Sequence, residues 1–186
     1  IAGMVKQNKE FILLDNQKVV YETAMEIAKK SNEDGKKRCL IVKGGPGTGK
    51  TVLAINLLSD LTNKPYEMVC HYVTKNAAPR AVFKAKLKGT EKISKIDNMF
   101  KGSGIYTEAK KDDVGVILED EAHRLNTKSG MFKNQGENQI KEIINAAKFS
   151  VFFIDETQRI DIYDIGSVAG IEKYLDEFEV FGEEKY

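Results

Sequence analysis

The sequence predicts an α/β fold in which helices cover both faces of a parallel sheet. Strand-like apolar runs alternate along the chain with segments whose apolar residues recur at intervals of three and four. The runs at residues 116–118 and 151–154 are apolar at every position, which is typical of strands covered on both faces. The chain has 186 residues, so we expect residues 1–186 to form a single domain.

Each element of this prediction follows from a local pattern. Apolar runs predict strands at residues 38–42, 67–73, 114–119 and 150–155, with a weaker one at 178–181. Helical periodicity predicts helices at residues 19–30, 51–61, 78–87, 138–148 and 168–178. Residues 88–113 contain three glycines and many lysines, and we expect a long surface excursion with one short helix there. Ligands of open α/β sheets bind at the carboxyl ends of the strands, so we expect the site there.

A glycine-rich run directly follows the first predicted strand. It fits the pattern G-x-x-x-x-G-K-[ST] at every position, through Gly44, Gly45, Pro46, Gly47, Thr48, Gly49, Lys50 and Thr51. Such a loop wraps backbone N–H groups around phosphates, and glycines permit the close approach. Lys50 would face the β- and γ-phosphates, and Thr51 would offer a hydroxyl to Mg²⁺. The run predicts a P-loop NTPase; the structural alternative is a glycine-rich surface turn.

Acidic residues follow the strand predicted at 114–119. Asp120 is suited to hold Mg²⁺ through water, and Glu121 can polarise or deprotonate the water that attacks the γ-phosphate. An acidic helix N-terminus that exploits the helix dipole is the alternative. The Glu119 side chain should alternate away from Asp120, so we expect a polar partner or solvent contact for it.

Two glutamines are further candidates. Gln158 follows the strand predicted at 150–155 and could contact the γ-phosphate or the attacking water, with a helix cap or surface role as the alternative. Gln17 precedes the first helix, and its amide could read donor and acceptor positions on an adenine edge. His123 could couple nucleotide state to a neighbouring domain, or make a structural hydrogen bond. Tyr72 could stack on a base, although we favour a core role.

Taken together, these motifs resemble the first motor domain of superfamily 1 helicases. The resemblance extends to the Schlafen-type DNA/RNA helicase-like ATPase family over residues 43–58, 73–87 and 120–159, including K-N-A-A-P-R at 75–80 and G-M-F at 130–132. It implies a RecA-like P-loop NTPase that uses ATP and Mg²⁺. By this resemblance, Gln17 corresponds to the adenine-reading motif and residues 44–51 correspond to motif I. Residues 74–80 correspond to the motif that touches single-stranded nucleic acid. Asp120 and Glu121 correspond to motif II, and Gln158 corresponds to motif III.

The resemblance leaves two hypotheses for function. The first is the ATP-hydrolysing half of a helicase-like protein that acts on DNA or RNA, with single-stranded nucleic acid and a second motor domain of the parent chain as partners. The second is a nucleotide-gated regulatory ATPase without helicase activity. The chain opens with Ile1 rather than Met, so we expect it to be excised from a longer protein. Because no arginine lies in a recognisable finger motif, we expect slow hydrolysis by this chain alone.

Charge and composition bear on the partners and the cellular compartment that we expect for the protein. There are 29 Lys and Arg against 28 Asp and Glu, and this balance argues neither for nor against nucleic acid. A basic run at residues 80–101 could contact a phosphate backbone, with a solvated face as the alternative. Cys39 and Cys70 lie in apolar runs, which favours buried thiols and a reducing, cytoplasmic setting. No apolar run reaches the ~18 residues of a membrane helix, so no membrane partner is expected.

Overall fold

The computed structural model describes residues 15–74, 93–129, 135–158, 165–178 and 180–185. The helix predicted at 78–87, most of the basic run and the family residues at 75–80 and 130–132 lie outside these ranges. Within them, the strands form a six-stranded parallel sheet in the order β3-β2-β4-β5-β1-β6. Its strands are β1 (Arg38–Lys43), β2 (Cys70–Val73), β3 (Phe100–Lys101), β4 (Val114–Glu119), β5 (Ala147–Ile154) and β6 (Phe181–Lys185). The predicted α/β parallel sheet is confirmed.

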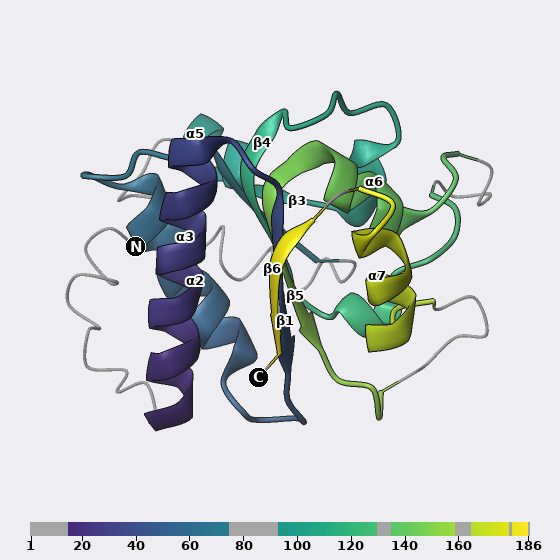
Figure 1. Ribbon diagram of the computed structural model, residues 1–186, viewed down its shortest axis with the longest axis horizontal. Helices are drawn as coiled ribbons and strands as arrows, with labels where there is room; N and C mark the ends of the chain where they lie inside the picture. The colour runs from purple at the N-terminus through teal and green to yellow at the C-terminus, as the bar shows by residue number, and fades with distance from the viewer. Residues whose placement is uncertain (1–14, 75–92, 130–134, 159–164, 179, 186) are drawn as a thin grey trace.

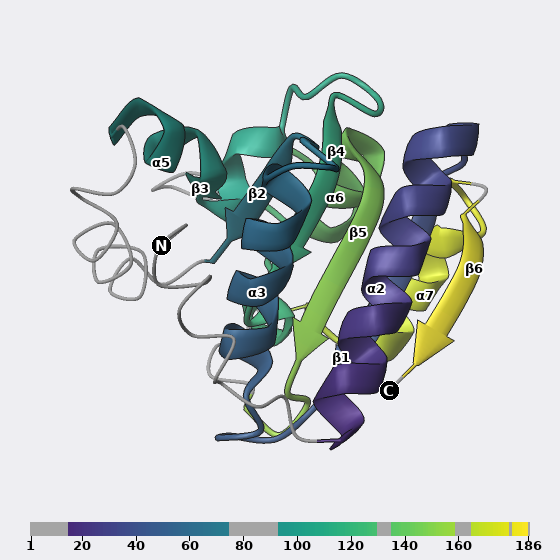
Figure 2. The same ribbon diagram turned by 90° about the vertical axis from the view of Figure 1, so that its left-hand side faces the viewer.

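Helices cover both faces of this sheet (Figures 1 and 2). One face carries α2 (Asp15–Asp34) and α3 (Lys50–Thr62), which pack on a core that includes Leu40, Tyr72 and Leu118. The other face carries α6 (Gln139–Ala146) and α7 (Val168–Leu175), with the short 3₁₀ helices η1 (Ser103–Tyr106) and η2 (Ala122–Arg124). α5 (Ile93–Met99) contacts the β2–β3 edge. Apolar side chains on both faces explain the unbroken apolar runs of the central strands.

Several strand predictions need correction, and one of them is β5, which begins at Ala147 rather than at residue 150. The second strand begins at Cys70 rather than at residue 67, because Glu67 has a φ of 47°, which an extended strand does not allow. The last strand lies at Phe181–Lys185 rather than 178–181, where it pairs with β1. β3 lies inside the stretch expected to be a surface excursion. A strand of two residues has no periodicity to detect, and its pairing with β2 defines it.

Helix boundaries also move. α2 extends beyond the predicted 19–30 at both ends, and ion pairs at i,i+4 spacing lie along its exposed face, including Glu26 with Lys30 at 2.8 Å. α6 begins after Asn138, whose side chain accepts a hydrogen bond from the Lys141 amide. α6 ends at Ala146 because the following residue already belongs to β5. α7 begins at Val168, as predicted, after an N-cap at Ser167, and it ends at Leu175 rather than at residue 178.

Cys39 and Cys70 are both buried, as the sequence predicted, and neither forms a disulfide within the part of the chain that the structure describes. Glu119 is fully buried, so the expected solvent contact is wrong for this residue. Burial raises the pKa of Tyr106 and of Tyr72, which lie in the cores on opposite faces of the sheet, and the charge of Glu119 raises both further. The predicted alternation of Glu119 and Asp120 stays a prediction. Among the described helices, none is both long and apolar enough to cross a membrane.

Candidate functional site

The glycine-rich loop lies at the carboxyl end of β1, between this strand and α3. Its first amide, on Gly44, donates to the carbonyl of Ile154 at the end of β5, at 3.1 Å. Gly47 and Gly49 have φ values of 73° and 82°, in the left-handed region that glycine adopts without strain. α3 starts directly after the loop, and the Leu53 amide donates to the Gly49 carbonyl at 3.0 Å. The loop therefore curls at the N-terminus of a helix, where backbone N–H groups attract anions.

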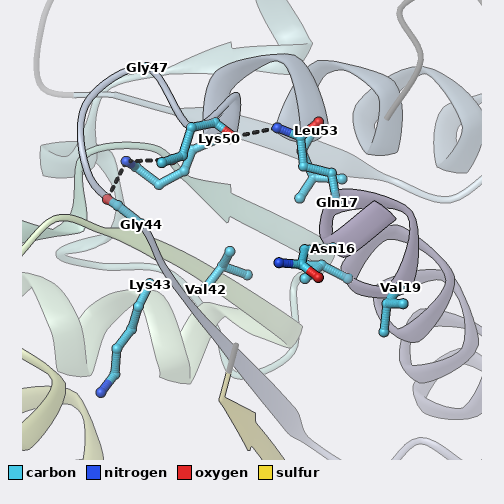
Figure 3. Close-up of a pocket in the computed structure, with 11 residues that line it drawn as sticks. Asn16, Gln17, Val19, Val42, Lys43, Gly44, Gly47, Lys50 and Leu53 are labelled. Carbon is cyan, nitrogen blue, oxygen red and sulfur yellow. Dashed lines mark hydrogen bonds between the residues drawn. The ribbon is translucent and has the colours of Figure 1, made fainter. Parts of the chain in front are cut away.

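Lys50 bends back over this loop (Figure 3). Its ammonium group donates to the carbonyls of Gly44 and Gly45, at 2.5 and 2.7 Å. These contacts keep the cation at the concave side of the loop, although the residue sits in the first turn of α3. A phosphate held by the loop would face this ammonium group directly.

Gln17 reaches the same loop from α2 (Figure 3). Its side-chain amide donates to the Thr48 carbonyl. A Cβ on Gly49 would lie 2.1 Å from the Gln17 amide nitrogen, so a side chain there would displace the Gln17 amide from the loop. The structure thus brings Gln17 to the loop, where its amide binds the loop backbone; the adenine-reading role remains a prediction.

A cavity of about 1050 Å³ opens between α2, the end of β1 and the loop. Its polar lining includes Asn16, Gln17, Lys43 and Lys50, and its apolar lining comes from Val19, Val20, Val42 and Leu53. Ligand cavities of this size typically combine an apolar wall with a few polar groups. The predicted placement at the carboxyl end of a strand agrees with the position of this cavity.

Thr51 and Asp120 meet beside the loop, although 69 positions separate them in the sequence. The Thr51 hydroxyl donates to Asp120 Oδ2 at 3.0 Å, and the phenol of Tyr72 donates to the same oxygen. Asp120 follows β4, and its amide donates to the Val73 carbonyl of β2 at 2.8 Å, which continues the strand pairing. A hydroxyl and a buried carboxylate are oxygen ligands of the kind that Mg²⁺ prefers. These residues fit the predicted magnesium site.

Glu121 has an unusual backbone conformation for a side chain of its size. Its φ and ψ are 62° and 43°, in the left-handed region, where it caps η2. Such outliers cluster at functional sites, because the surrounding structure must hold them against their cost. The Thr74 hydroxyl, just beyond β2, donates to Glu121 Oε2 at 3.3 Å. The end of β2 thus contacts both predicted acids, one through Tyr72 and one through Thr74.

The end of β5 joins the loop to the acidic segment. β5 lies between β1 and β4, so the residues after it come between the two predicted motifs. The Asp155 amide donates to His123 Nδ1 at 3.2 Å, which confirms the structural hydrogen bond considered for His123. Burial lowers the pKa of His123, with nearby Lys50 and Arg124 acting in the same direction. The pKa of Asp155 is also lowered, because the Thr157 hydroxyl donates to its carboxylate at 2.6 Å.

Gln158 lies at this edge of the sheet, just after β5. Its amide donates to the Asp155 carbonyl at 3.1 Å, which closes a turn after β5. Its proposed role at the γ-phosphate remains a prediction.

Sequence reasoning missed two contributors to the site. Tyr72 is fully buried and reaches Asp120, so the base-stacking role considered for it is wrong. Gly166 lies so close to η2 that a Cβ there would be 1.7 Å from the Ala122 carbonyl oxygen. No local pattern reveals either contact, because both depend on segments that are distant in the sequence.

Comparisons with known proteins show which family this chain resembles. A family model described as Schlafen group 3, DNA/RNA helicase domain, matches residues 37–186. Among solved structures, the chain matches the Hef helicase domain of Pyrococcus furiosus with 15% identity and a TM-score of 0.47, covering 92% of this chain and 37% of that one. The chain thus spans little more than a third of that structure. A search of curated proteins found no match. The family model covers most of the chain, including the loop and both acids, and this protein therefore belongs to the Schlafen group 3 DNA/RNA helicase domain family.

Proposed function

We propose that this chain is the ATP-binding and ATP-hydrolysing motor domain of a helicase-like protein that acts on single-stranded DNA or RNA. The observation that carries the proposal is the 3.0 Å hydrogen bond between Thr51 and Asp120 beside a complete phosphate loop. This contact joins the two predicted metal-holding residues from opposite ends of the site. A structural glycine-rich turn would need no such acid against it.

The residues of the chain divide the work as follows. The loop N–H groups and the Lys50 ammonium group bind the phosphates, and the apolar walls of the cavity receive the base and sugar. Thr51 and Asp120 would hold Mg²⁺, which would supply positive charge beside the phosphate oxygens. Glu121 orients a water molecule and accepts its proton, and Gln158 contacts the γ-phosphate or that water.

The family description and the fold support the nucleic-acid part of the proposal. The arginines fit a chain that binds ATP well and hydrolyses it slowly by itself. Arg38 makes two hydrogen bonds of 2.8 Å to the Asp34 carboxylate at the far end of β1 from the loop, which leaves it unsuited to the phosphates. Arg124 lies beside His123 in η2, and Arg80 and Arg159 lie outside the described residues. We propose that a second motor domain of a longer parent chain supplies the arginine finger, which is typically worth ~10³ to 10⁵ in rate.

Two measurements test the proposal. Calorimetry should show Mg²⁺-dependent ATP binding that Lys50→Ala removes, because this change deletes the cation that faces the phosphates. Lys29→Ala is the control that should leave ATP affinity unchanged, since Lys29 is 61% exposed and is not among the residues that line the cavity. Equal affinities in the native chain and Lys50→Ala would overturn the site.

ATPase assays of the longer parent protein test whether the domain acts on nucleic acid. The assays are run with and without single-stranded DNA and RNA, at two salt concentrations. Stimulation by a polymer that weakens at higher salt supports a motor on nucleic acid. Hydrolysis that ignores every polymer would support a nucleotide-gated regulatory ATPase instead. Equal single-turnover rates for this chain and its parent would show that no second domain is needed.

A further inference from the structure

The carboxylate of Asp120 is held by a group that belongs to none of the recognised motifs. Tyr72 lies on β2 and is fully buried. Its phenol donates a hydrogen bond to Asp120 Oδ2. Thr51 donates to this same oxygen at 3.0 Å. One carboxylate oxygen therefore receives two hydroxyl donors, one from the helix after the phosphate loop and one from a neighbouring strand.

Strand register explains how Tyr72 reaches the site. Tyr72 pairs with Leu118 in the β2–β4 ladder, and Asp120 comes two positions after Leu118. Alternation along β4 therefore puts Leu118 and Asp120 on the same face of the sheet, which is the face covered by α3. Thr51 comes to this face in the first turn of α3.

Packing fixes the orientation of the phenol. The Tyr72 ring lies against Phe100 of β3, with ring centroids 5.4 Å apart and planes inclined by 58°. A phenol keeps its proton at neutral pH, and a carboxylate can only accept, so Tyr72 is the donor in this hydrogen bond.

We propose that Tyr72 is a positioning residue for the metal site, which holds Asp120 in the orientation that Thr51 and a magnesium ion require. The proposal rests on the proposed function and adds to it a residue on β2. Groups that hydrogen-bond to a metal-holding carboxylate fix its orientation, and their loss typically costs about 10- to 100-fold in metal affinity. The alternative is that the phenol serves only the core, with Asp120 satisfying its buried hydroxyl.

Magnesium dependence separates these two roles. Calorimetric titrations of ADP at a series of Mg²⁺ concentrations would compare the native chain with Tyr72→Phe. The phenylalanine keeps the ring against Phe100 and removes only the hydroxyl. We expect the Mg²⁺ concentration for half-maximal gain in ADP affinity to rise about tenfold, with ADP affinity in EDTA unchanged. A midpoint within twofold of the native value would overturn the proposal, because a core role alters the melting temperature and leaves Mg²⁺ dependence unchanged.

A matched control comes from a second Tyr–Asp pair. Tyr21 of α2 donates its phenol hydrogen to Asp60 Oδ2 on α3, away from the phosphate loop. Tyr21→Phe should leave the Mg²⁺ midpoint unchanged. Failure of the native chain to show any Mg²⁺-dependent ADP binding would overturn the proposed function itself, and the Tyr72 proposal with it.

A second measurement keeps the hydroxyl in place, and so does not depend on how Tyr72→Phe folds. Site-specific 3-fluorotyrosine at position 72 reports on the phenol by fluorine NMR. We expect its resonance to move when Mg²⁺ is added to the ADP-bound chain. A resonance that ignores Mg²⁺ would overturn the proposal.

Discussion

Lys37 is a buried lysine whose replacement gives the sharpest test of the packing described above. Its side chain is 5% exposed, and its ammonium group donates to Asp112 Oδ1 at 2.6 Å. It also donates to the backbone carbonyls of Ile144, Asn145 and Ala147, at the junction of α6 and β5. One cation thus provides hydrogen-bond donors for backbone carbonyls at the end of α6 and at the beginning of β5. Lys37→Met keeps the aliphatic stem and removes the cation.

The magnitude follows from the partners left behind. Removing one member of a buried charged pair typically costs ~3–5 kcal/mol, and each buried carbonyl left unsatisfied costs about 1–3 kcal/mol. Burial lowers the pKa of Lys37, which means that removing the ammonium group from water costs free energy in the native chain. Lys37→Met avoids this desolvation cost, so the net loss of stability is smaller than the sum of the lost contacts. We therefore expect a loss of about 3 kcal/mol in the free energy of unfolding. For a chain of this size the melting temperature should fall by roughly 6–12 °C.

Urea unfolding followed by circular dichroism would measure this change. Lys29→Met is the control, because Lys29 is 61% exposed and lies 4.0 Å from its partner Glu33, so a change within about 0.5 kcal/mol is expected. Asp112→Asn should cost less than Lys37→Met, since the Asp112 side chain is 28% exposed and the three carbonyls keep their donor. A loss below about 1 kcal/mol for Lys37→Met would refute the reasoning. Nucleotide affinity below the melting temperature should not change, because Lys37 precedes β1 and the loop follows it.

Three further predictions concern the site and its surroundings. Glu121→Gln should retain ATP binding while hydrolysis by the complete protein falls by about 10² or more, as expected for loss of a general base. Gly166→Ala should destabilise the chain by roughly 1–3 kcal/mol and reduce hydrolysis, because its Cβ would meet the backbone of Ala122 and displace η2. Stability should fall as the pH decreases from about 6.5 toward 4, because burial lowers the pKa of His71 to about 4 and the unfolded chain then binds more protons.

Each of these has a control and a contrary outcome. An unchanged turnover rate in Glu121→Gln would mean that another residue serves as the base. Gly104→Ala should be milder than Gly166→Ala, since its nearest neighbour is the Ser129 side chain at 3.2 Å. His71→Gln should flatten the pH dependence of urea unfolding below pH 6.5. Some slope should remain, because burial also lowers the pKa of His123, and an unaltered slope would contradict the assignment to His71.

The sequence by itself determined the fold class and the phosphate loop. Unbroken apolar runs require cover on both faces of a sheet, and the strand predicted at 114–119 matches β4 at both ends. The spacing of glycines around Lys50 specifies a loop whose backbone geometry few other sequences could adopt, so a purely local pattern was enough. The left-handed φ values of Gly47 and Gly49 agree with that reasoning.

Only the tertiary structure decided which groups donate hydrogen bonds to Asp120 and Glu121. Strand order is set by pairing between segments far apart in the chain, and it brings β5 between β1 and β4. Register then carries Tyr72 to Asp120, and the close packing of two loops requires a glycine at position 166. The two-residue strand β3 exists for the same reason, because its backbone pairs with β2. Such contacts depend on distances across the fold, which local sequence patterns do not encode.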